Sequence, residues 1–147
     1  MPAVPPPRTG GPVPGAAPDV PRGDLWEIPF AAEDLYELRR LVAGWAARET
    51  MPEEAADDLV LSVHELATNS VRHGGGVGML RLWRTVEALV CEVQDAGRLS
   101  DPSIGSEQPG DAAAESRGLW IARQLCDLVE IGTGPAGTLV RLHKRFV

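Results

Sequence analysis

The chain has 147 residues and a formal net charge of −7, which leaves room for one domain of ordinary size. The negative balance argues against a protein that grips nucleic-acid phosphates, because such affinity comes from clustered lysine and arginine. No apolar run approaches the roughly 20 residues that a membrane-spanning helix needs, and the first residues do not resemble a secretory signal. We therefore expect a cytoplasmic protein that contacts neither nucleic acid nor membrane directly.

The first 22 residues differ in composition from the rest of the chain. They contain eight prolines, three charged residues and almost no large apolar side chains. Such a segment cannot bury enough surface to offset the entropy lost on ordering. We predict a disordered, proline-rich tail over 1–22 and a folded domain over 23–147.

The folded part alternates between strand-like and helix-like patterns. Weak alternation predicts a strand over 25–30, at a sheet edge because of Pro29. Apolar residues at helical spacing predict helices over 31–49 and from Pro52 to the glycines at 74–76. The remaining predicted elements are strands over 77–85 and 88–95, a mobile loop over 96–116, a helix over 118–128, and strands over 128–132 and 138–146. This order favours an α+β sandwich with the helices on one face of the sheet.

Two motifs that resemble known sites fail on their surroundings, and a third kind of site is excluded by composition. The segment 132–137 matches G-x-G-x-x-G, but a strand rather than a helix follows it, so we predict a hairpin turn. His64 and Glu65 begin a zinc-protease pattern whose second histidine position holds Thr68. The single lysine, Lys144, stands too close to the end of the chain to serve a phosphate-binding P-loop.

Glu65 and Asn69 are the first candidate functional residues. They lie four residues apart in the second predicted helix and therefore share one helical face. A carboxylate there is suited to accept a proton, and an amide oxygen is suited to hold a hard cation such as Mg²⁺. Taken alone, the pair favours the alternative, a solvated polar face.

Two further segments carry candidate residues. Asp95 continues the inward row of the strand over 88–95, where a buried carboxylate needs partners such as the amine of a base, and Gly97 would let a flat ring approach. A simple Asp–Gly turn is the alternative. Arg117, Gly118 and Leu119 open the next predicted helix, where free N–H groups and a guanidinium suit phosphates; an ordinary helix start is the alternative.

Together, in this order, these segments resemble the Bergerat-fold ATPases shared by gyrase, heat-shock chaperones, mismatch-repair proteins and histidine kinases. Glu65-x-x-x-Asn69 resembles the N box of that family, Asp95-x-Gly97 its first glycine box and Arg117-Gly118-Leu119 its second, while Thr138 resembles its late threonine. The segments HELATNSVRHG and SRGLWIARQLCD are most similar to the RsbW-type anti-sigma-factor serine kinases of bacteria. Leu99 and Ser116 stand where many members of the family have glycine.

The resemblance implies a two-layer sandwich with a mixed, mostly antiparallel sheet and about three helices, and an ATP lid over about 96–117. It implies that Asp95 binds the adenine amine, directly and through water with Thr138, and that Asn69 holds Mg²⁺ at the ATP phosphates. Arg117, Gly118 and Leu119 would lie at the phosphates, with Gly97 at the base. Glu65 would be the general base for an incoming hydroxyl.

The resemblance also implies partners. The expected enzyme is an ATP-dependent protein-serine/threonine kinase whose substrate is a serine of a STAS-like anti-anti-sigma protein. It would also sequester a sigma factor and form a homodimer. Two alternatives stay open: an ATP-binding sequestering module with little or no kinase activity, and the detached catalytic domain of a histidine kinase.

Overall fold

The structure, a computed structural model, describes residues 23–97 and 114–147, with only the backbone described for 114–116. The predicted tail, 1–22, lies outside the described residues. So do residues 98–113, which make up most of the predicted lid and include Leu99.

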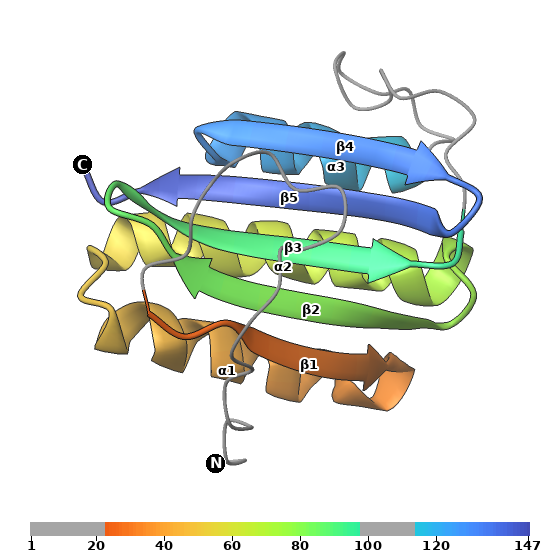
Figure 1. The fold of residues 1–147 in the computed structure, drawn as a ribbon, viewed down its shortest axis with the longest axis horizontal. Helices are drawn as coiled ribbons and strands as arrows, with labels where there is room; N and C mark the ends of the chain where they lie inside the picture. The colour runs from red at the N-terminus through yellow and green to blue at the C-terminus, as the bar shows by residue number, and fades with distance from the viewer. Residues whose placement is uncertain (1–22, 98–113) are drawn as a thin grey trace.

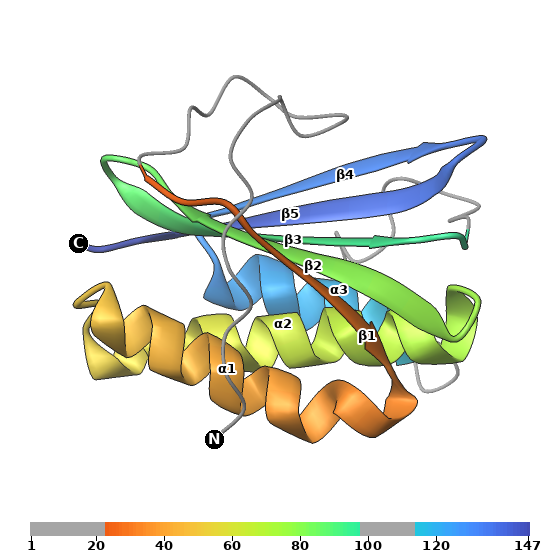
Figure 2. The same cartoon turned by 60° about the horizontal axis from the view of Figure 1, so that its bottom comes forward.

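Three α-helices cover one face of a five-stranded sheet (Figures 1 and 2). The sheet order is β1-β2-β3-β5-β4, and each of these four pairings is antiparallel. The strands are β1 (Trp26–Ala31), β2 (Val77–Arg84), β3 (Ala88–Asp95), β4 (Leu128–Gly134) and β5 (Gly137–Arg145). The helices are the 3-10 helix η1 (Ala32–Asp34), α1 (Leu35–Arg48), α2 (Glu53–His73) and α3 (Ala114–Leu125). The predicted α+β sandwich is therefore confirmed.

Three predicted helix boundaries differ from the observed ones. The first α-helix begins at Leu35 because the residues before it form η1, whose Asp34 carboxylate accepts a hydrogen bond from the Ala31 N–H at 2.9 Å. The last helix begins at Ala114 rather than Gly118, and it ends at Leu125 rather than residue 128. The chain turns there because the Asp127 N–H donates to the His143 carbonyl at 2.9 Å, which joins the chain to the sheet.

A predicted edge strand and a predicted hairpin turn are confirmed. Pro29 lies in β1, an edge strand, where its missing N–H costs no central sheet hydrogen bond. The segment 132–137 forms a β-hairpin in which Gly134 pairs with Gly137 across a two-residue turn. The glycine pattern therefore belongs to sheet construction.

The main core lies between the helices and the sheet. Alternate residues of the central strands face the helices and are completely buried, among them Leu80, Leu82, Leu89, Cys91 and Leu142. Cys91 and Cys126 are both buried free thiols in this core. Burial raises the pKa of each thiol, which favours the unreactive protonated form. Within the described ranges, no helix has the length and apolar character that a bilayer crossing requires.

The opposite face of the sheet carries a row of alternating charges, which we call the charge ladder. Strand register places its members side by side across all five strands: Glu27, Arg81, Glu92, Arg141 and Glu130. The central contacts are the shortest, because Arg141 donates two hydrogen bonds to Glu92 Oε2 at 2.8 and 3.0 Å and Arg81 lies 3.2 Å from Glu92 Oε1. The outer contacts, Arg81 to Glu27 and Arg141 to Glu130, measure 3.7 and 3.8 Å.

Candidate functional site

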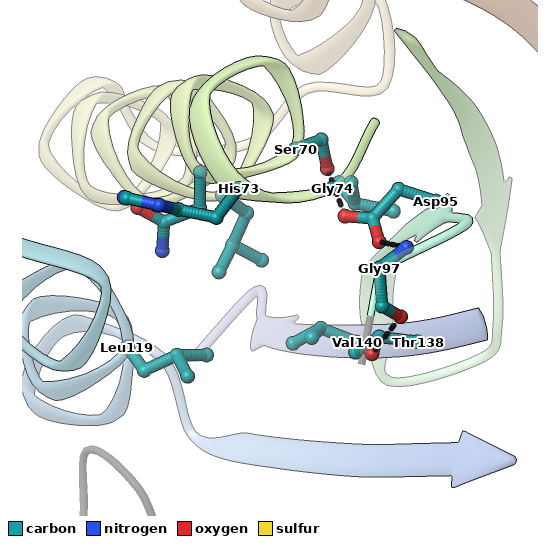
Figure 3. Close-up of a pocket in the computed structure, with 11 residues that line it drawn as sticks. Ser70, His73, Gly74, Asp95, Gly97, Leu119, Thr138 and Val140 are labelled. Atoms are coloured by element: carbon teal, nitrogen blue, oxygen red, sulfur yellow. Dashed lines mark hydrogen bonds between the residues drawn. The ribbon is translucent and has the colours of Figure 1, made fainter. Parts of the chain in front are cut away.

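A pocket lies where the C-terminal end of α2 meets the end of β3 (Figure 3). Its volume is about 30 Å³ for the centre of a water-sized sphere, which is room for little more than one water molecule. Its lining comes from α2, β3, α3, β5 and the turns beside them: Leu66, Asn69, Ser70, His73, Gly74, Val93, Asp95, Gly97, Leu119, Thr138 and Val140. The lining therefore combines leucine and valine side chains with polar ones, among them Asn69, His73 and Asp95.

Asp95 is held by neutral donors from two segments. The Ser70 hydroxyl donates to its Oδ2 at 2.6 Å, and the Gly97 N–H donates to its Oδ1 at 2.8 Å. Thr138 in turn donates from Oγ1 to the Gly97 carbonyl at 2.7 Å, so these residues form one connected chain of hydrogen bonds (Figure 3). Among the described residues, no positively charged side chain pairs with Asp95. The described donors thus orient the carboxylate without neutralising its charge.

Glycines allow the backbone to close around this carboxylate. A Cβ on Gly74 would overlap the Asp95 carboxylate itself, and one on Gly137, whose φ is +121°, would overlap the Asp95 carbonyl oxygen. A Cβ on Gly97 would lie 2.7 Å from the Gly74 Cα. The Ala96 N–H donates to the Gly74 carbonyl at 3.2 Å and completes the contact between the end of α2 and the end of β3.

Asn69 lines the pocket one residue before Ser70, and α3 packs closely against it. A Cβ on Gly118 would lie 2.9 Å from Asn69 Nδ2, so the absence of a side chain lets the two helices approach here. The sequence predicted that Gly118 lies among the first free N–H groups of its helix. This prediction is wrong, because α3 begins at Ala114 and Gly118 therefore lies inside the helix. The next residue, Leu119, is buried and lines the pocket.

Glu65 and Arg117 lie beside the pocket rather than in its lining. Glu65 is partly exposed one helical turn before Asn69, and Arg117 is exposed one residue before Gly118. Next to Glu65, His64 has a buried Nδ1 for which the described part of the chain supplies no hydrogen-bond partner. Burial and the positive charge of Arg39 lower the pKa of His64, although Glu65 raises it, so the ring favours its neutral form.

The structure thus brings together most of the residues that the sequence singled out. Asn69, Asp95, Gly97, Leu119 and Thr138 line one pocket, although they come from four separate segments. Sequence reasoning missed what Ser70, Gly74 and Gly137 do. One feature of the sequence could have indicated the role of Ser70. It is a polar residue on the buried side of α2, in line with Leu59, Val63 and Leu66.

Comparisons with known proteins bear on the fold and the family of the chain. The family model described as the histidine kinase-like ATPase domain matches residues 28–144. A chain in the crystal structure of the SiaB-SiaC complex from Pseudomonas aeruginosa aligns with a TM-score of 0.60 and 14% identity, covering 81% of this chain and 87% of that one. No protein with a curated description matches this chain.

A second solved structure is the histidine kinase domain of the blue-light activated histidine kinase from Erythrobacter litoralis EL346. It aligns with a TM-score of 0.50 and 23% identity. The alignment covers 76% of this chain and 59% of that chain. At these identities the two structures show the shared fold, and the family match covers nearly all of the folded part. The chain belongs to the histidine kinase-like ATPase domain family.

Proposed function

We propose that this protein binds ATP in the pocket, with the adenine amine donating a hydrogen bond to Asp95. The observation that carries the proposal is an oriented carboxylate in a pocket that leucine and valine side chains also line. Two neutral donors orient Asp95, and no described cation neutralises it, so its remaining lone pairs suit the amine of a flat base. Because the cavity is only about 30 Å³, adenine enters when the lining side chains move apart.

The phosphates would extend from the base toward Asn69 and α3. Among the described residues, no group of three or more His, Cys, Asp or Glu side chains is placed to hold a metal ion. The Asn69 amide oxygen nevertheless fits Mg²⁺, because this ion usually keeps several waters and binds through few protein ligands plus substrate phosphates. Bound there, Mg²⁺ would neutralise phosphate charge. Arg117, Gly118 and Leu119 would lie beside the phosphates.

Glu65 would accept the proton of the attacking hydroxyl. It stands one turn from Asn69 on the same helix, which would place this carboxylate near the phosphates that Asn69 and Mg²⁺ hold. We propose that the hydroxyl belongs to a serine of a STAS-like anti-anti-sigma protein, and that the protein also sequesters a sigma factor as a homodimer in the cytoplasm. The structural neighbour solved as the SiaB-SiaC complex supports a protein partner.

A second candidate function is an ATP-loaded sequestering module that transfers little or no phosphate. The observation that favours it is that Glu65 lies outside the pocket lining, whereas Asn69 and Asp95 lie within it. Both candidates require ATP binding, and they differ only in the chemistry at Glu65.

The test pairs Glu65→Gln with Glu54→Gln, which is the same change at an exposed position of α2. Each protein is incubated with labelled ATP, Mg²⁺ and the anti-anti-sigma protein encoded near it. We expect Glu65→Gln to lower the rate of partner phosphorylation by about 10²-fold or more, while ATP affinity changes by less than about threefold. Glu54→Gln should behave as the wild type.

Three results decide between the candidates. Normal transfer by Glu65→Gln would show that Glu65 is not the general base. ATP binding without transfer by the wild type would favour the sequestering module. A wild type that binds no nucleotide would contradict both. Asn69→Ala is expected to lose Mg²⁺-dependent nucleotide binding and transfer together.

A further inference from the structure

Ser70 occupies an unusual place for a hydroxyl. It is 1% exposed on the buried side of α2, yet it also lines the pocket, where its only hydroxyl hydrogen is directed to Asp95 Oδ2 at 2.6 Å. A buried polar group needs a partner, and Ser70 meets that need with the residue that would bind the base (Figure 3). The bond joins residues 25 positions apart in the chain.

The hydrogen-bond capacity of the two residues shows what remains for a ligand. An ionised carboxylate has about four acceptor positions, of which Ser70 and Gly97 each fill one. The Ser70 hydroxyl donates its hydrogen to Asp95, so its oxygen can only accept hydrogen bonds from other groups. The part of the pocket beside Ser70 and Asp95 therefore presents acceptors, and a ligand group placed there has to donate a hydrogen bond.

We propose that Ser70 is a positioning residue that fixes the Asp95 carboxylate against the adenine amine and so sets a preference for adenine over guanine nucleotides. This inference rests on the proposed ATP site. Adenine carries an amine donor at the ring position where guanine carries a carbonyl acceptor. A carboxylate fixed in this position accepts a hydrogen bond from the adenine amine. It disfavours the guanine carbonyl, because a buried acceptor that faces another acceptor stays unsatisfied.

Without the Ser70 hydroxyl, the carboxylate keeps a single described donor, the Gly97 N–H. Its terminal torsion is intrinsically broad, so one donor no longer fixes both oxygens. The carboxylate would then spend part of its time turned away from the amine. The expected loss is therefore confined to ligands that carry the amine.

The experiment uses Ser70→Ala and, as its matched control, Ser62→Ala in the full chain. Ser62 is also completely buried in α2, but it lies two turns before Ser70, and its hydroxyl donates to the Asp58 carbonyl at 2.8 Å. Calorimetry measures affinity for three ligands: ATP, GTP and the purine riboside triphosphate that lacks the amine. Thermal melting of each variant accompanies the binding measurements.

We expect Ser70→Ala to weaken ATP about tenfold, as loss of a hydrogen bond to a charged group implies. The amine-free nucleotide and GTP should change less than about twofold, so the ATP-to-GTP preference falls about tenfold. Ser62→Ala should leave all three affinities unchanged. A merely structural role for Ser70 would weaken the three ligands alike.

Two results overturn the inference alone: unchanged ATP-to-GTP preference in Ser70→Ala, or equal losses for ATP and the amine-free nucleotide. In either case the wild type still binds ATP, and the proposed function stands. A wild type that binds none of the three ligands overturns the proposed function and this inference together.

Discussion

Two carboxylates on β3, Glu92 and Asp95, lie three residues apart on opposite faces of the sheet. Glu92 is 0% exposed in the middle of the charge ladder, between Arg81 and Arg141. Burial raises the pKa of Glu92 above its usual value, and the two guanidinium groups limit that rise. Asp95 is only partly buried and is held by the Ser70 hydroxyl and the Gly97 N–H.

The difference lies in the kind of partner. Guanidinium groups neutralise Glu92 and fill its oxygens, so this carboxylate can only hold strands together. Neutral donors orient Asp95 but leave its charge and part of its acceptor capacity available. The same residue chemistry on one strand thus gives a structural carboxylate on one face and a ligand-binding candidate on the other.

The largest expected effect comes from removing the charge of Glu92. Glu92→Gln keeps the side-chain size but leaves two arginines without their shared counter-ion, which should lower the free energy of unfolding by about 3–5 kcal/mol. Urea denaturation measures this, with the exposed Glu87→Gln as the control. ATP affinity of the protein that remains folded should not change. A stability loss equal to that of Glu87→Gln would show that the ladder contributes nothing measurable.

The next effect comes from crowding Asp95. In Gly74→Ala the new Cβ overlaps the Asp95 carboxylate, and relieving such overlap typically costs about 1–3 kcal/mol. We expect lower stability and weaker ATP binding together. Gly132→Ala on β4 is the control, because a Cβ there meets nothing within 4 Å. Equal ATP affinity in the two variants would mean that the orientation of Asp95 is irrelevant to binding.

A third change tests the charge of Asp95 directly. Asp95→Asn replaces an acceptor with an amide that can point a donor at the adenine amine, and it should weaken ATP at least about tenfold, or about 1.4 kcal/mol. GTP binding should weaken less. Calorimetry with both nucleotides measures the difference. Unchanged ATP affinity would identify Asp95 as a turn residue only.

The smallest effect is expected at the rim of the charge ladder. Glu27 lies 3.7 Å from Arg81, and its side chain is 17% exposed, so Glu27→Gln should cost less than about 1 kcal/mol of unfolding free energy. Urea denaturation of Glu27→Gln and Glu92→Gln compares the loss of unfolding free energy at the rim of the charge ladder with the loss at its centre. Equal losses at the two positions would show that the ladder acts as one unit rather than as separate pairs.

Local patterns predicted much of this molecule. The strand over 88–95 has the predicted bounds, and α2 ends at the predicted glycines. The candidate residues Asn69, Asp95, Gly97, Leu119 and Thr138 came from motif spacing, and the structure places them around one pocket. Their roles in binding ATP remain predictions.

The features that the sequence did not predict depend on contacts between distant segments. The charge ladder requires the strand register that sets Glu27 beside Arg81 and Glu130 beside Arg141. The sequence shows Gly74 as a helix end, and only the packed structure shows that its missing side chain makes room for Asp95. The start of α3 was misplaced by four residues because Gly118 was interpreted as a helix boundary, whereas it provides close packing against Asn69.

The continuity of α2 limits how the chain can change in length. Glu65, Asn69 and Ser70 lie on one uninterrupted helix, so about 6 Å along its axis separates Glu65 from Asn69. One residue inserted between them would turn every later side chain by about 100°, which carries Ser70 away from Asp95. An insertion at the exposed turn of Val86 and Glu87 would move none of them. Proteins built on this arrangement should therefore vary in length at their turns and keep the spacing within this helix.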